Sequence, residues 1–147
     1  MMADLRHILL AEDSANDAEL TLAALKTNHV VNEVVITRDG AETLDYLWRR
    51  NAYADRSGGN PGLMLLDLKM PKVDGLEVLR QVKGSPEFKT IPIVVLTSSR
   101  EEQDVVRSYD LGVNAYVVKP VEMHAFVEAV SLLGGFWAVV NEPPPAR

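Results

Sequence analysis

The chain has 147 residues, of which 47% are apolar and 24% charged, and it carries a formal net charge of −6 at pH 7. This length suits one domain with a single apolar core. The acidic balance argues against nucleic-acid binding, which needs a basic surface. The absence of cysteine excludes disulfides and thiolate metal sites, and it fits a reducing compartment.

We expect neither a signal peptide at the N-terminus nor a membrane-spanning segment along the chain. The N-terminus lacks the apolar stretch of a signal peptide. No apolar run approaches the roughly 18 residues that span a membrane. We therefore expect a cytoplasmic protein without a membrane-embedded part and without nucleic acid as a partner.

Five short apolar runs are spaced along the chain. They are His7–Ala11, Val34–Thr37, Leu63–Leu66, Ile93–Thr97 and Ala115–Val118. Each run is almost continuously apolar rather than alternating, which is typical of strands that are buried on both faces of a parallel sheet. The sequence therefore predicts five parallel strands.

Helical spacing follows each predicted strand, because apolar residues recur three or four positions apart. In chain order these residues are Ala18, Leu22 and Leu25; Ala41, Leu44 and Leu47; Leu76, Leu79 and Val82; Val105 and Tyr109; and Phe126, Val130 and Leu133. Capping-box patterns at 14–17 and 74–77 mark two of the helix starts. The alternation of strand and helix predicts an α/β fold with right-handed crossovers.

Two segments interrupt this alternation. Arg49–Gly62 is long for a connection and ends in the loop sequence S-G-G-N-P-G. After the domain, which we place at residues 1–133, a tail of residues 134–147 contains the apolar cluster Phe136–Val140 and a proline-rich end. This cluster is either an extension of the core or part of a dimer contact, and the sequence leaves both open.

Charged and hydroxyl side chains leave the strands at the edge where ligands bind in open α/β sheets. Glu12 and Asp13 follow the first predicted strand, Asp67 the third and Lys119 the fifth, while Thr97 ends the fourth. Three neighbouring carboxylates cannot all stay ionised without a compensating charge. Mg²⁺ suits such a group, because it prefers oxygen ligands and keeps several waters.

A metal, a lysine and a hydroxyl around one carboxylate are what a phosphoryl group needs for charge stabilisation. Asp67 would then be a nucleophile that forms an aspartyl phosphate. Each residue alone has an ordinary explanation as a solvated acid, a strand threonine or a surface lysine. Their joint placement favours a site, and we assign the nearby Asp17 to helix capping.

The order and spacing of these residues resemble the receiver domains of two-component response regulators. The shared features are the pair Glu12-Asp13, Asp67 in L-L-D-L-K-M-P, Asp74-Gly75, Thr97 in I-P-I-V-V-L-T-S-S, and Lys119-Pro120 in A-Y-V-V-K-P. The resemblance runs from about Leu5 to Leu133. It implies a flavodoxin-like, doubly wound fold with five parallel strands in the order 2-1-3-4-5.

The resemblance also implies a role for each site residue. Asp67 is expected to accept a phosphoryl group from a sensor histidine kinase. Mg²⁺, or Mn²⁺ in its place, is expected to bind Asp13, Asp67 and the backbone carbonyl of Lys69, with Glu12 acting through water or as a further ligand.

The resemblance also implies how phosphorylation would be sensed and passed to the surface of the domain. Thr97 and Lys119 are expected to bind phosphoryl oxygens. Thr97 and the aromatic Tyr116 are expected to form the switch that carries phosphorylation to the surface. The protein is then a phosphoacceptor in signalling rather than an enzyme.

A finer resemblance is to the stand-alone regulators that pair with bacterial phytochromes. It rests on the stretches S-S-R-E-E-Q-D and S-Y-D-L-G-V-N-A-Y and on F-W near the end. It implies a homodimer without an effector domain and a bacteriophytochrome as the kinase. Lys69 and Ser98 depart from residues that are common in receivers, and Lys69 leaves the lifetime of the phosphorylated state open.

Three other functions compete with this one. A haloacid-dehalogenase-type phosphatase needs a second aspartate two residues after the nucleophile, where this chain has Lys69. A flavin or nucleotide binder needs a phosphate-cradling loop after the first strand, where Glu12 and Asp13 would repel phosphate. The remaining alternative is a receiver-like interaction module that is never phosphorylated, although neither Asp67 nor Lys119 has been lost.

Overall fold

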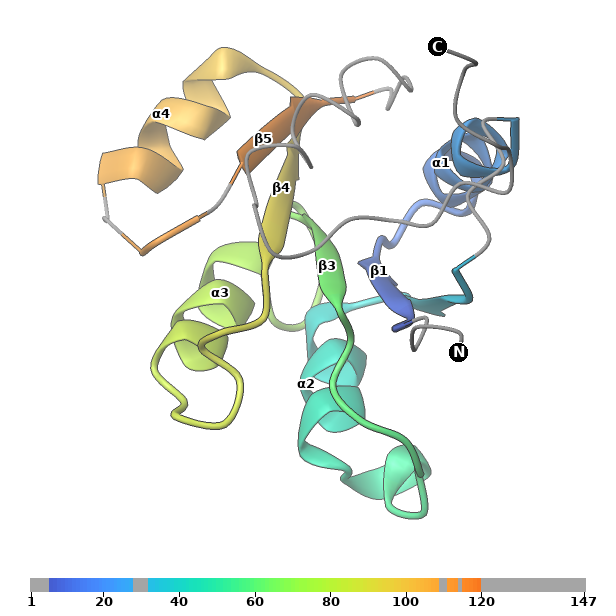
Figure 1. The fold of residues 1–147 in the computed structure, drawn as a ribbon. Helices are drawn as coiled ribbons and strands as arrows, with labels where there is room; N and C mark the ends of the chain where they lie inside the picture. Colours follow the sequence, from blue (N-terminus) through green and yellow to red (C-terminus); the bar gives the residue numbers. More distant parts are fainter. Residues whose placement is uncertain (1–5, 28–31, 109–110, 114, 120–147) are drawn as a thin grey trace, which may run out of the picture.

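The computed structural model describes residues 6–27, 32–108, 111–113 and 115–119, which form the fold drawn in Figure 1. The strands are β1 (Ile8–Ala11), β2 (Val34–Thr37), β3 (Leu63–Asp67), β4 (Ile93–Thr97) and β5 (Ala115–Val118). The helices are α1 (Ala15–Thr27), α2 (Gly40–Trp48), α3 (Gly75–Lys83) and α4 (Arg100–Ser108), with a short 3₁₀ turn, η1, at Asn51–Tyr53.

The strands form one parallel sheet in the order β2-β1-β3-β4-β5, which confirms the predicted topology. The strand bounds agree with the sequence to within one residue. One of the two differences matters for the site: β3 extends to Asp67, which pairs with Leu96 of β4. The acceptor candidate is therefore the last residue of a central strand and not the first residue of a loop.

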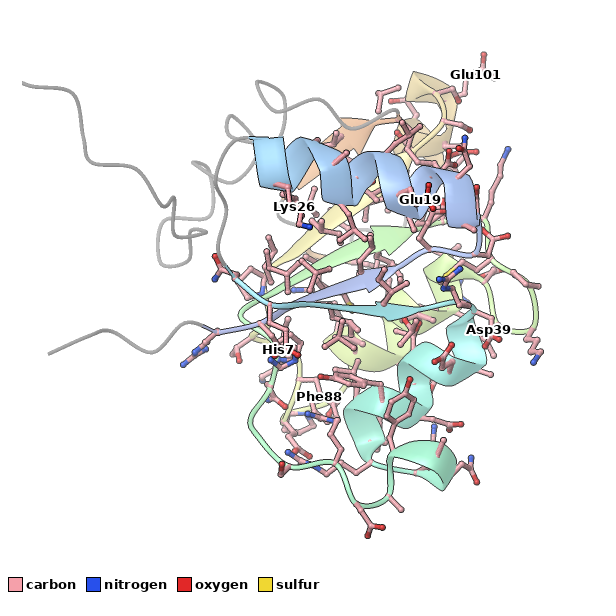
Figure 2. The ribbon with its side chains drawn as sticks, turned by 90° about the vertical axis from the view of Figure 1, so that its right-hand side faces the viewer. His7, Glu19, Lys26, Asp39, Phe88 and Glu101 are labelled. Atoms are coloured by element: carbon pink, nitrogen blue, oxygen red, sulfur yellow. The ribbon has the colours of Figure 1, made fainter. Side chains whose placement is uncertain are left out.

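The apolar residues of the strands divide between two faces, because successive side chains point to opposite sides of a sheet. One face packs against α2, α3 and α4, with Leu9, Leu66 and Val95 among its strand residues. The other face packs against α1 through Ala18 and Leu25. Figure 2 shows α1 and α2 on opposite sides of the sheet. This layering explains why the strands are apolar at almost every position.

Side-chain caps begin two of the helices next to the site edge. The Asp39 carboxylate accepts the Glu42 N–H at 2.7 Å and starts α2. The Asp74 carboxylate accepts the Glu77 N–H at 2.9 Å and starts α3, which confirms the predicted start at 74–77.

The long connection after α2 is held by Arg56. Its Nε donates to the Tyr46 carbonyl at 2.8 Å, and its guanidinium lies 4.1 Å from the centre of the Tyr46 ring. The Tyr46 hydroxyl in turn lies 2.7 Å from His7 Nε2 at the start of β1. The segment predicted as loop is thus tied to the sheet by a cation–π contact and by hydrogen bonds.

Several predictions fall outside the described residues. These are the last helix around Phe126, Val130 and Leu133, the apolar contribution of Tyr109, the Phe136–Val140 cluster and the tail of residues 134–147. Within the described part of the chain, no helix has the length and apolar character needed to cross a membrane.

Candidate functional site

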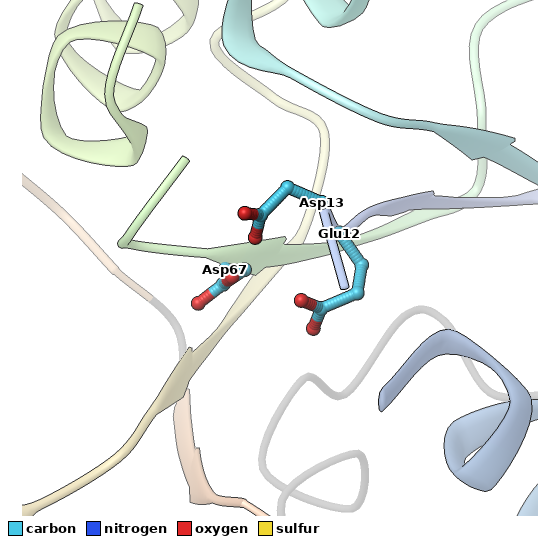
Figure 3. A group of neighbouring side chains, drawn as sticks. All are labelled: Glu12, Asp13 and Asp67. Carbon is cyan, nitrogen blue, oxygen red and sulfur yellow. The ribbon is translucent and has the colours of Figure 1, made fainter. Parts of the chain in front are cut away.

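Three carboxylates meet at the carboxyl ends of β1 and β3 (Figure 3). Glu12 and Asp13 leave β1, and Asp67 ends β3. One oxygen from each of the three lies within 4.8 Å of the others. Glu12 is fully buried and Asp67 is 4% exposed, whereas Asp13 is open to solvent. The structure thus brings together the acidic residues that the sequence placed at this edge.

The environment of Asp67 disfavours its ionised form. Burial and then the charge and hydrogen bonding of Glu12 raise the pKa of Asp67 to about 7. Lys119 and the Lys69 N–H, which donates to Asp67 Oδ1 at 3.3 Å, act in the opposite direction without cancelling the rise. The site therefore holds more negative charge than its own cations neutralise, and a divalent cation would restore the balance.

Lys119 is shared among three carboxylates that come from different segments. Its Nζ lies 3.1 and 3.3 Å from the two Glu12 oxygens, 2.8 Å from Asp17 Oδ2 and 3.5 Å from Asp67 Oδ2. Burial would lower the pKa of Lys119, but the hydrogen bonds to Asp17 and Glu12 and the charge of Asp67 raise it above its usual range. The ammonium therefore stays charged and bridges α1, β1 and β3.

The assignment of Asp17 to the helix cap is confirmed for its backbone N–H, but its carboxylate serves another partner. The Asp17 N–H does take part in the cap, because it donates to Ser14 Oγ at 3.1 Å. The reciprocal place at the Ser14 N–H is taken by Glu12, whose Oε2 accepts it at 3.2 Å. The Asp17 carboxylate is thus available to Lys119, and α1 is connected to the site by an ion pair.

Thr97 carries a hydroxyl that has no partner within the described residues. The residue is fully buried, and Oγ1 makes no hydrogen bond there. A buried hydroxyl without a partner is costly, so such groups often mark a place where a ligand or water binds. The Thr97 carbonyl accepts the Lys119 N–H at 2.7 Å, which connects the two residues directly through the backbone.

Glu102, in the first turn of α4, is a residue that the sequence reasoning did not assign to the site. Its carboxylate lies 2.8 Å from Lys69 Nζ and accepts both the N–H and the hydroxyl of Ser98, at 2.9 and 2.7 Å. The hydrogen bond to Glu102 raises the pKa of Lys69. Burial would raise the pKa of Glu102, but the bonds from Lys69 and Ser98 lower it.

The sequence did contain a signal for the helix start at which Glu102 lies. Ser99 and Glu102 have the S-x-x-E spacing of a capping box, and the Glu102 N–H donates to Ser99 Oγ at 3.3 Å. That spacing predicts the helix start but gives no indication of the ion pair with Lys69.

Gly75 allows α3 to begin directly against the end of β3. Its N–H donates to the Leu68 carbonyl at 2.9 Å. A Cβ at this position would overlap the Asp67 carbonyl oxygen and crowd the Leu68 backbone. Only glycine fits this approach, so Asp74-Gly75 is both a helix start and a packing requirement of the site.

Tyr116 lies on β5, where it pairs with Val95 and is partly buried against the core on the α2–α3 side. Its role as a switch stays a prediction, as does the Lys69 carbonyl as a metal ligand.

Comparison with known proteins places the chain in a family. The model of the response regulator receiver domain matches residues 8–131. The response regulator Rcp1 of Synechocystis sp. is 42% identical over 139 residues, which cover 95% of this chain and 93% of Rcp1.

Solved structures give the same result. The bacteriophytochrome response regulator AtBRR has 61% identity and a TM-score of 0.90, and the match covers 95% of this chain and 100% of AtBRR. The Mn²⁺-bound form of Rcp1 has 39% identity and a TM-score of 0.72, with 96% of this chain and 99% of that one covered. The phosphorylated cyanobacterial phytochrome response regulator RcpA has 41% identity and a TM-score of 0.71, with 89% and 91% covered. The sequence, the fold and the arrangement of the residues at the strand ends all agree with this family. The chain belongs to the response regulator receiver domain family.

Proposed function

We propose that this chain receives a phosphoryl group from a histidine kinase on Asp67, in a reaction that depends on a divalent cation. The observation that carries the proposal is the surroundings of Asp67. Asp67 is a buried carboxylate with two acidic neighbours and a charged lysine. On the adjacent strand β4, the buried Thr97 hydroxyl makes no hydrogen bond in the described structure. The family membership supports signalling by phosphorylation, and RcpA has been solved in a phosphorylated form.

The residues fit a hard divalent cation. Three carboxylate oxygens lie within 4.8 Å of one another, and burial together with the negative charge of Glu12 raises the pKa of Asp67. Mg²⁺ or Mn²⁺ would bind Asp13 and Asp67, with Glu12 near enough to act directly or through water. Rcp1 has been solved with Mn²⁺, which supports this proposal. Such an ion, when bound, neutralises the carboxylates and the incoming phosphoryl group.

The residues of the chain have separate roles in the transfer. An Asp67 carboxylate oxygen forms a bond to phosphorus while the bond between phosphorus and the donor breaks, and that electron pair leaves with the donor. Lys119 and the Thr97 hydroxyl hold phosphoryl oxygens as charge shifts onto them. The chain is thus a phosphoacceptor, and we assign it no reaction on a separate substrate.

Intact mass after incubation with acetyl phosphate and Mg²⁺ tests the proposal. We expect the wild type to gain one phosphoryl group, and to gain none after Asp67→Asn or in excess EDTA. Asp55→Asn, an exposed aspartate in the connection after α2, is the matched control and should gain as the wild type does. No gain in the wild type would instead favour an interaction module that is never phosphorylated.

The finer proposals concern the partners. Receivers of this family pair with histidine kinases, and the likeness to AtBRR supports a bacteriophytochrome as the kinase. The cytoplasm is the location that we propose for this pairing. We also propose a homodimer through the C-terminal half. Val105 of α4 and Val118 of β5 support it, because both are large apolar side chains about half exposed.

Sedimentation at micromolar concentration tests the dimer. Val105→Ser should shift the population towards monomer, whereas Leu20→Ser, which changes an exposed apolar residue of α1, should leave it unchanged. Monomer alone in the wild type, with and without phosphorylation, would contradict the dimer.

A further inference from the structure

Glu102 joins the two loops that flank the site. Its Oε1 accepts the Ser98 N–H at 2.9 Å, and its Oε2 accepts the Ser98 hydroxyl at 2.7 Å and lies 2.8 Å from Lys69 Nζ. Ser98 follows Thr97 at the end of β4, and Lys69 lies two residues after Asp67. One carboxylate on α4 is therefore connected to the residue after Thr97 and to the second residue after Asp67.

The position of the Lys69 ammonium depends on Glu102. The Lys69 side chain is 75% exposed, so packing does not hold it in place. Its backbone is close to the acceptor, since its N–H donates to Asp67 Oδ1 at 3.3 Å. A lysine has a flexible four-carbon stem. From this backbone position the ammonium can turn towards Glu102 or towards Asp67, and in the structure it is paired with Glu102.

A second ammonium at Asp67 would interfere with the proposed site. Lys119 already lies 3.5 Å from Asp67 Oδ2 and is hydrogen-bonded to Glu12 and Asp17. If Lys69 also paired with Asp67, the two cations would occupy the oxygens that a divalent ion needs as ligands. Metal binding would then require one ammonium to leave first.

We propose that Glu102 is a positioning residue, which holds the Lys69 ammonium away from Asp67 and so keeps the acceptor carboxylate open to a divalent cation. The proposal rests on the function proposed above for Asp67. It assigns a role in the reaction to a residue outside the three carboxylates, the lysine and the threonine of the site.

The first test is the affinity of the unphosphorylated protein for Mg²⁺ alone, measured by titration calorimetry. Glu102→Gln keeps an oxygen that can accept the Ser98 N–H but removes the charge that attracts Lys69. We expect the Kd for Mg²⁺ to rise about threefold to fivefold, the size that a partly exposed charge pair supplies. Glu101→Gln makes the same charge change one residue earlier, at an exposed position, and should leave the Kd unchanged.

A double-mutant cycle identifies Lys69 as the intermediary. Once Lys69→Gln has removed the ammonium, adding Glu102→Gln should not change the Kd further. If Glu102 instead acted only by adding negative charge or by fixing Ser98, its removal would weaken Mg²⁺ binding equally in both backgrounds. Glu102→Ala provides a second variant should the Gln form fail to fold, because alanine is favourable in a helix.

Phosphorylation by acetyl phosphate gives an independent readout. Glu102→Gln should slow the reaction at low Mg²⁺ and approach the wild-type rate at saturating Mg²⁺. An unchanged Kd in Glu102→Gln, or an equal rise with and without Lys69, would overturn the positioning role. Either result, obtained while the wild type still gains a phosphoryl group, leaves the proposed function intact. Failure of the wild type to gain one would count against that function instead.

Discussion

Replacing Asp67 by asparagine should stabilise the metal-free fold, and by more as the pH rises. Burial and Glu12 raise the pKa of Asp67 from 3.8 to about 7 in the folded protein. An unfolded chain releases this proton near pH 4, whereas the folded protein keeps it until about pH 7. The unfolded state therefore binds fewer protons in this window, and the stability of the wild type falls as the pH rises through it. Asparagine has no proton to lose and avoids this loss.

The size of the effect follows from the shift in pKa. Each tenfold change in proton affinity corresponds to about 1.36 kcal/mol. Raising the pKa of Asp67 from 3.8 to about 7 therefore costs the ionised wild type about 4 kcal/mol above pH 7. At pH 5 the cost is about 1 to 2 kcal/mol. The advantage of Asp67→Asn should grow by about 2 to 3 kcal/mol between pH 5 and pH 8.

Urea unfolding in EDTA at pH 5, 6, 7 and 8, followed by circular dichroism, measures this growth. Asp55→Asn, at an exposed position, is the control and should show no such trend. Added Mg²⁺ at pH 8 should stabilise the wild type but not Asp67→Asn, because binding to the folded state alone raises its stability. A stability difference between Asp67→Asn and wild type that is constant or shrinks from pH 5 to pH 8 would refute the reasoning.

Three further predictions concern packing and hydrogen bonding. Thr97→Val should keep the free energy of unfolding within about 1 kcal/mol of the wild type, because Oγ1 has no partner in the described structure. It should slow phosphorylation by acetyl phosphate about tenfold or more, which intact mass over time would measure. Gly75→Ala should cost about 1 to 3 kcal/mol in urea unfolding because its Cβ would overlap the Asp67 carbonyl, whereas Gly59→Ala, with open space around it, should not. Arg56→Ala should lower stability by about 1 to 2 kcal/mol and speed limited proteolysis of the connection after α2; unchanged proteolysis would contradict its anchoring role.

The sequence predicted the fold because its signals are local and agree with one another. Apolar runs mark each strand, and Asp74 caps α3 where its spacing to Glu77 indicated. The carboxyl ends of parallel strands share one edge of the sheet, and this rule alone was enough to predict that Glu12, Asp13 and Asp67 meet there.

What the sequence could not predict depends on competition between groups that are distant in the chain. Glu12 accepts the Ser14 N–H, and the Asp17 carboxylate pairs with Lys119 instead. Lys69 pairs with Glu102 across two loops, although no periodic pattern connects them. Which of several possible partners a charged side chain pairs with depends on the distances in the folded chain, and the sequence alone does not give these distances.

The pairing of β5 with β4 has a consequence for how the protein can lose its activity. Thr97 is in register with Val118, and the next N–H, that of Lys119, donates to the Thr97 carbonyl. In the described structure β5 is an edge strand with β4 as its one neighbour. Local opening of this edge would withdraw Lys119 from the carboxylates while the other four strands stay paired. A one-residue shift in the register of β5 against β4 would turn the Lys119 side chain to the opposite face of the sheet. The proposed acceptor site can therefore be dismantled at a free-energy cost below that of global unfolding, while most of the fold persists.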